Sequence, residues 1–188
     1  MLGVFDADKV IQAAGVLLKA ADPHRMSRLR LLKLLYIADR ENIQHRGRPI
    51  TGDTVVAMDH GPVLGRTYDC IKGGDPASGS WERYIRRSGA QDVELFADPG
   101  VGKLSRQEIA RLQEVAERYE HLNDYAIAII THKFQEWVDN QPPEGSSRPI
   151  PSRAILEALG MGGEVADDIL EETRAHATAQ RRLASLRK

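Results

Sequence analysis

The sequence has almost no cysteine: Cys70 is alone among 188 residues. A single cysteine excludes an internal disulfide and a zinc site built from several cysteines. No stretch approaches the roughly 18 consecutive apolar residues of a membrane-spanning helix. The first residues, which include Asp6 and Asp8, lack the basic start and the apolar core of a signal peptide. We therefore expect a cytoplasmic protein that has no contact with a membrane.

Net charge is also nearly absent, because 26 Lys and Arg face 27 Asp and Glu, for a formal charge of −1. Such a chain has no overall field that would draw it to nucleic acid. Motifs that carry chemistry are missing as well: there is no HExxH, no GxSxG and no GxxxxGK[ST]. The length suits one well-buried domain with an appended piece, and we expect neither a cofactor nor a metal.

The apolar stretch that starts at Arg28 predicts the central helix of the domain. At about 100° per residue, its apolar residues fill more than half of the circumference, which is too much for a surface helix. Ser27 can cap the start, and Gly47 can end the helix. Asp39 falls inside the apolar arc. Because an unpaired buried carboxylate is costly, we expect it to have a partner.

The residues after this helix predict a turn, a short strand and a second helix. We assign the framework of the turn to Gly47, Pro49 and Asp53. Residues 55–58 are apolar enough for a strand, and residues 59–62 end it. Since proline suits the first turn of a helix, we place Pro62, directly after Gly61, at the start of the second helix.

Asp39 has three candidate cationic partners nearby in sequence, Arg46, Arg48 and His60. We hypothesise that it ties the turn to the central helix by pairing with one of them, as a structural ion pair without chemistry. An enzymatic alternative stays open, in which Asp39, Asp59, His60 and His132 form an acid–base site of a hydrolase.

Several further elements follow. Residues 6–21 have helical spacing, residues 72–80 form a loop, and residues 92–96 alternate like a strand that could pair with residues 54–58. Ser105 and Glu108 form a capping box for the next helix. A helix that starts near Asn123 is, with Tyr125 and Ile129, too apolar for a surface position; we expect His132 and Trp137 to close it.

Two other features leave open which partner the protein binds. Trp81 and Tyr84 lie among Arg83, Arg86 and Arg87, and aromatic residues mixed with arginines can stack on bases, so a phage-related regulator that binds nucleic acid is a second alternative. The last helix, from about 164 to 186, has acids early and bases late, as the helix dipole favours. It is thinly apolar after Thr173, so we expect it to project or to meet a partner, for example as a homodimer.

Ordered motifs then identify a resemblance. KLLYIADR, GRPITGD, AMDHGPV and the following YD, together with LSRQE and THKFQEW, resemble the Panacea domain of SocA-like antitoxins, which include phage-associated proteins. The resemblance covers roughly residues 5–140. It implies a mostly helical domain that neutralises a cognate protein toxin by direct binding, in one case with delivery of the toxin to a protease. It implies no cofactor and no catalysis.

We therefore predict a mainly α protein: a compact helical domain around a buried central helix, with a small two- to three-stranded antiparallel β element and a C-terminal helical extension. The domain spans residues 1–140, a linker 141–149 and the extension 150–188. Its function is that of an antitoxin. Binding energy usually resides in a few aromatic or arginine anchors, for which the candidates are Arg46, Arg48, His60, Arg66, Trp81 and Tyr84.

Overall fold

The computed structural model describes residues 2–185. Within that range the helices are α1 (Ala7–Lys19), α2 (Arg28–Arg46), α3 (Gly65–Lys72), α4 (Ser78–Glu82), α5 (Arg106–Arg118), α6 (Asp124–His132), α7 (Gln135–Val138), α8 (Ser152–Ala158) and α9 (Gly163–Ser185). The strands are β1 (Arg25–Ser27), β2 (Val55–Met58), β3 (Gly61–Leu64), β4 (Ile85–Ser88), β5 (Asp92–Leu95) and β6 (Arg148–Pro149). The mainly α class is confirmed, with two small three-stranded antiparallel sheets, β1-β5-β4 and β3-β2-β6.

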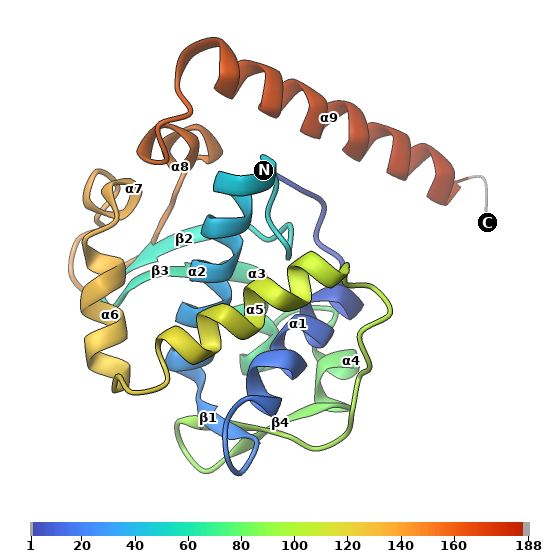
Figure 1. Cartoon of the computed structure of the whole chain (residues 1–188), viewed down its shortest axis with the longest axis vertical. Helices are drawn as coiled ribbons and strands as arrows, with labels where there is room; N and C mark the ends of the chain where they lie inside the picture. The colour runs from blue at the N-terminus through green and yellow to red at the C-terminus, as the bar shows by residue number, and fades with distance from the viewer. Residues whose placement is uncertain (1, 186–188) are drawn as a thin grey trace.

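Helix α2 is the buried centre of the domain, as predicted. Every residue from Leu31 to Asp39 is buried, and α1, α5, α6 and β3 pack around the helix (Figure 1). The Ser27 hydroxyl accepts the Arg30 amide at 3.0 Å at the start of the helix. Gly47 ends it with φ 69°, and its amide donates to the Ile43 carbonyl at 2.7 Å.

The second helix starts later than we predicted, because Gly61 and Pro62 belong to a strand. β2 and β3 form a tight hairpin in which Met58 lies opposite Gly61 and Ala57 lies opposite Pro62. Gly61 has φ 94°, which suits glycine directly after the two-residue connection. β3 is an edge strand, so the missing amide of Pro62 costs no ladder hydrogen bond. Helix α3 therefore begins at Gly65.

The predicted pairing of residues 92–96 with residues 54–58 is also wrong. β5 pairs with β4 on one side and with β1 on the other. The loop between β4 and β5 is only three residues long, and such short loops favour a hairpin between neighbouring strands. The open edge of β2 is instead taken by β6, where Val56 lies opposite Pro149.

Helix α6 lies at the edge of the body rather than inside it (Figure 1). It ends at His132, and Trp137 belongs to the separate short helix α7. Tyr125 is 75% exposed and Ile129 39% exposed, so the prediction that this helix is too apolar for the surface is wrong. Only the face that meets α2 and β3 is buried.

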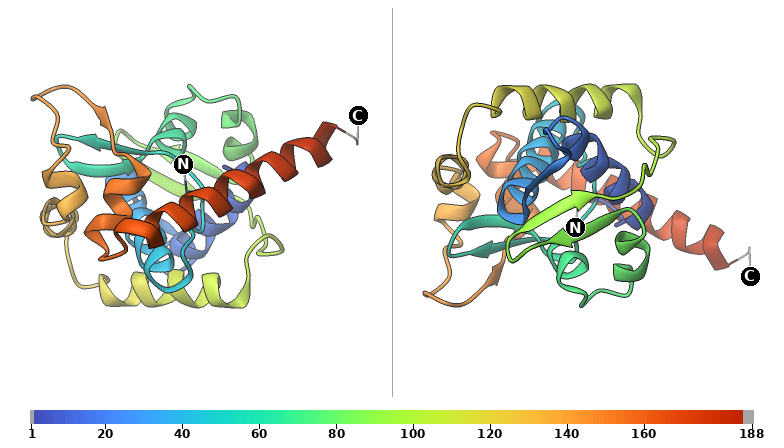
Figure 2. Two further views of the ribbon diagram at one scale, coloured as in Figure 1. Left: turned by 90° about the horizontal axis from the view of Figure 1, so that it is seen from above. Right: turned by 90° about the horizontal axis from the view of Figure 1, so that it is seen from below.

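The C-terminal elements share a second apolar cluster with the rest of the body. Its buried members are Leu2, Ile43, Ala57, Trp137, Ile150, Ile155, Leu156 and Ala166. Helix α8 packs on α7, and α9 packs on α8 before running past the body (Figure 2). No helix in the described part of the chain is long and apolar enough to cross a bilayer.

The second cluster predicts that α8 contributes to the stability of the body. Replacing Ile155, which is 3% exposed, by alanine should lower the free energy of unfolding by about 2 to 5 kcal/mol, because it removes buried apolar contacts. The same change at the exposed Ile129 should cost about 1 kcal/mol or less. Urea denaturation followed by circular dichroism compares the two variants, and equal effects would contradict this assignment.

Candidate partner-binding site

Asp39 holds the turn that follows α2, but through hydrogen bonds to the turn and not through an ion pair. Its Oδ1 accepts the Ile50 amide at 2.8 Å and the Thr51 amide at 3.0 Å. Its Oδ2 accepts the hydroxyl of Thr51. Burial raises the pKa of Asp39, and the three hydrogen bonds lower it. The effect of burial is the larger one, so the pKa of Asp39 is about 7. The turn is thereby fixed to the centre of the helix.

The predicted pairing of Asp39 with a cation is therefore wrong. Arg46 and Arg48 are exposed near the end of α2, and His60 is exposed at the tip of the β2–β3 hairpin. Among the described residues, Asp39 forms no ion pair with any of them. The donors present in the turn already satisfy both carboxylate oxygens, so a cation is not needed.

Asp53, at the other end of the turn, caps helix α3. Its carboxylate accepts the amides of Arg66 at 3.1 Å and of Thr67 at 2.8 Å, and the hydroxyl of Thr67 at 2.7 Å. These are free donors of the first helical turn, which a carboxylate stabilises. Two buried carboxylates, Asp39 and Asp53, thus connect α2, the turn and α3.

Lys33 lies under the β2–β3 hairpin, fully buried. Its Nζ donates to the Pro62 carbonyl at 2.7 Å, and burial lowers its pKa to about 7. A Cβ at position 61 would lie 2.6 Å from Thr131 Oγ1 and 2.9 Å from Lys33 Nζ, so Gly61 is required by close packing as well as by its φ. Lys33 was not among the residues predicted to be functional. Its place within an otherwise apolar helix was the sequence feature that could have indicated it.

His132 and Trp137 pack together beside this hairpin. Their rings stack with centroids 4.3 Å apart and an interplanar angle of 6°. The Trp137 indole donates to the Met58 carbonyl at 3.1 Å. Burial lowers the pKa of His132, and the electrostatic effect of the nearby Lys33 lowers it further. Both residues support the hairpin from α6 and α7.

A buried glutamate, Glu136, completes the polar layer around α2. Glu136 Oε1 accepts the Tyr36 hydroxyl and the Arg40 Nε, each at 2.7 Å. The Arg40 guanidinium also lies 4.3 Å above the Phe134 ring. This cluster was not predictable from local patterns, because Glu136 follows Tyr36 by 100 residues and Arg40 by 96.

The enzymatic alternative required four residues at one site, which the fold does not assemble. Asp39 bonds to the turn, whereas Asp59 accepts the Gly145 amide at the hairpin tip. No hydrogen bond or ion pair joins Asp39 to His60 in the described structure. Within residues 2–185, no three His, Cys, Asp or Glu side chains are grouped as metal ligands.

The six candidate anchors do not share one surface. Trp81 is 3% exposed, in the main core, and Tyr84 is half-buried. Arg66 donates to Asp75 at 2.8 and 3.1 Å and lies 4.0 Å above the Phe5 ring. Helix α4, which carries Trp81, lies on the opposite side of the body from the hairpin (Figure 1). Of the six, Arg46, Arg48 and His60 are exposed.

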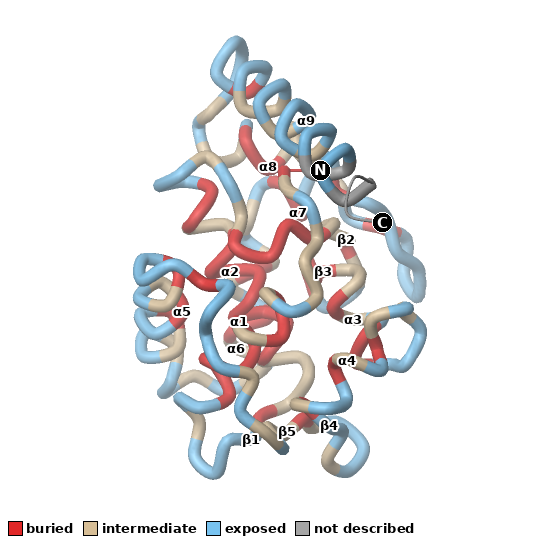
Figure 3. The backbone as a smooth tube through the Cα atoms, turned by 90° about the vertical axis from the view of Figure 1, so that its right-hand side faces the viewer, coloured by how far each residue is buried: buried red, intermediate tan, exposed pale blue. Residues whose placement is uncertain are grey.

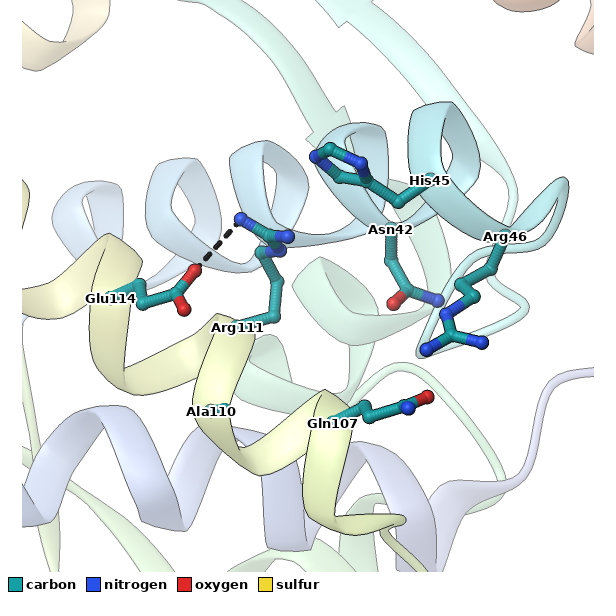
Figure 4. Close-up of a pocket in the computed structure, with 7 residues that line it drawn as sticks. All are labelled: Asn42, His45, Arg46, Gln107, Ala110, Arg111 and Glu114. Atoms are coloured by element: carbon teal, nitrogen blue, oxygen red, sulfur yellow. Dashed lines mark hydrogen bonds and ion pairs between the residues drawn. The ribbon is translucent and has the colours of Figure 1, made fainter.

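Arg46 lines a polar cleft of about 350 Å³ between α2 and α5 (Figure 4). The lining residues are Asn42, His45, Arg46, Gln107, Ala110, Arg111 and Glu114. Arg111 is held by Glu114 at 2.8 Å and by Glu41 at 3.1 Å. His45 and Arg46 have no ion pair among the described residues, so the cleft offers the Arg46 guanidinium to an anionic group of a partner. Of the residues that line the cleft, only Arg46 was predicted from the sequence as a candidate anchor.

Residues 31–138, more than half of the chain, match the family described as "Antitoxin SocA-like, Panacea domain". The chain belongs to this family. No curated protein and no solved structure matches it significantly. The resemblance in the motifs is confirmed, and the matched part of the Panacea domain extends from α2 to α7, with α8 and α9 outside it.

The role of Asp39 in the Panacea domain can be tested with two substitutions. Asp39→Ala should lower the free energy of unfolding by about 3 kcal/mol or more, because two buried amides lose their acceptor. Asp39→Asn should cost about 1 kcal/mol, because an amide oxygen can still accept both and the amide nitrogen can donate to the Thr51 hydroxyl. Denaturant unfolding measures both. If asparagine proved as damaging as alanine, the charge itself would be essential.

The buried Lys33 predicts that stability rises with pH. Its pKa is about 7 in the folded protein, whereas the ordinary value is 10.5. Between pH 7 and 9 the unfolded chain therefore binds more protons, and the free energy of unfolding should increase, by at most about 1.4 kcal/mol per pH unit. Urea denaturation at pH 7, 8 and 9 measures this rise.

A matched pair of variants assigns the rise to Lys33. The Lys33→Met protein should show a flatter profile over the same range, while the exposed Lys72→Met control should keep the slope of the parent protein. A parent protein whose stability did not change between pH 7 and 9 would contradict the assignment.

Proposed function

We propose that this protein is the antitoxin of a toxin–antitoxin pair and that it neutralises a cognate protein toxin by direct binding. The observation that carries the proposal is the match to the SocA-like antitoxin family over residues 31–138. The buried polar residues of the matched region support the same conclusion. Asp39, Asp53 and Lys33 bond to backbone groups of the domain itself, as residues of a binding scaffold do.

We place the toxin at the cleft between α2 and α5. His45 and Arg46 come from the last turn of α2 and have no ion pair among the described residues, whereas Arg111 is already held by two glutamates. An acidic side chain of the toxin fits this arrangement, because an arginine can bind a carboxylate through two hydrogen bonds. Arg46 is then the anchor, and the exposed Arg48 follows it two residues later in the chain.

The second part of the proposal is presentation of the bound toxin to a protease. It predicts a shorter half-life of the toxin in cells that contain the antitoxin. Binding alone leaves the half-life unchanged or longer. The half-life of the toxin, measured in the co-expression experiment that identifies it, therefore distinguishes presentation to a protease from binding alone.

The test starts from the reading frames adjacent to this gene, each expressed alone and together with this protein. One frame should arrest growth, and co-expression should restore it. Arg46→Glu should weaken binding of the purified toxin at least about tenfold, or about 1.4 kcal/mol, in isothermal titration calorimetry.

Arg83→Glu is the matched control, because Arg83 is also exposed but follows α4 on another side of the body. It should leave the affinity unchanged. Equal losses for both variants would remove the cleft from the proposal. Adjacent frames that are all harmless when expressed alone would remove the antitoxin function itself.

A further inference from the structure

Helix α9 leaves the body of the protein after its first turns. Ala166 is buried, and Ile169 and Leu170 pack on the second apolar cluster. From Arg174 onward, the described side chains are exposed or half-buried, and the helix extends beyond the rest of the molecule (Figures 2 and 3). Most helical stability in proteins comes from packing of an apolar face, and the body supplies little such packing to the distal half of α9.

The outward side of α9 carries a continuous face of its own. At about 100° per residue, Asp168, Glu172, Ala175, Ala179 and Leu183 lie on one side, roughly opposite Ala166 and Thr173. Leu183 is 58% exposed, and it borders a shallow groove with Ala175 and Ala179. Ala175 and Ala179 lie in the middle of this face. Their side chains are small, so a second helix can approach closely there.

The charges of α9 identify the occupant. Its acidic residues, Glu164, Asp167, Asp168, Glu171 and Glu172, come first, and the basic residues Arg174 and Arg182 come later. A second copy that ran parallel would place like charges together, whereas an antiparallel copy would place each acidic half along a basic half. The helix is thus complementary to itself in the antiparallel direction.

We propose that two copies of this chain form a dimer through antiparallel pairing of their α9 helices. With Ala175 opposite Ala179 of the second copy, Glu172 faces Arg182, and Leu183 lies over the stem of Glu171. The two-fold axis repeats each contact, so every charge pair occurs twice. Because each copy contributes only one helix, the contact is small, and we expect a weak dimer that dissociates on dilution.

The test is sedimentation equilibrium of the full-length protein from about 1 µM to about 1 mM. The parent protein should change from monomer to dimer over this range. Glu172→Arg alone and Arg182→Glu alone should each raise the dimer Kd at least about tenfold, since each places two like-charge pairs in the contact. The double variant Glu172→Arg/Arg182→Glu reverses both pairs and should return the Kd to within about threefold of the parent value.

Controls separate this contact from general effects of charge and folding. Glu82→Arg, an equal charge reversal at the exposed end of α4, should leave the Kd unchanged. Every variant should still unfold cooperatively on heating at low concentration, because Glu82, Glu172 and Arg182 lie outside the apolar core. A parent protein that stays monomeric at 1 mM overturns the proposal, as does a dimer that either single reversal leaves intact or that the double variant fails to restore.

Discussion

A carboxylate that binds backbone amides instead of a cation is the interaction on which the rest of this domain depends. Asp39 reaches from the middle of α2 to the amides of Ile50 and Thr51, so the turn cannot move independently of the buried helix. From that fixed turn, Asp53 caps α3. One buried helix thereby sets the direction of the next helix through a segment that has no regular structure of its own.

Helix α2 fixes two other regions in the same way. Lys33 donates to Pro62 in the hairpin, and Tyr36 binds Glu136 of α7. Three polar side chains of one helix therefore hold the turn, the hairpin and α7. Each is satisfied by a group of the fold itself, and a buried polar group that is satisfied by the fold stabilises one arrangement rather than reacting with a ligand. The recognisable motifs of the Panacea domain are in this sense a scaffold, and the proposed function assigns recognition of the toxin to exposed residues.

How far the sequence could predict the structure depends on how local each interaction is. Ser27, Gly47 and the Ser105–Glu108 capping box act within one helix turn, and all three were predictable. Asp39 was correctly expected to be buried with a partner, but backbone donors carry no sequence signal, so the choice of a cation was wrong. Pro62 fits a helix start and an edge strand equally well, and only the sheet distinguishes them. Of the cleft, Arg46 was predictable by its type, whereas its neighbours on α5 depend on tertiary packing.

The cleft and the proposed dimer face of α9 are separate surfaces, and only the base of α9 lies beside the end of α2. The end of α2 carries Arg46, and the adjacent Gly47 lies beside Ile169 of α9: a Cβ at Gly47 would be 3.8 Å from Ile169 Cδ1. Any residue larger than glycine would also need the left-handed conformation of that position. The base of α9 is therefore held against the last turn of α2, while the outward face of α9 points away from it. The proposed toxin site in the cleft and the proposed dimer face on α9 use no residue in common, so neither contact would exclude the other.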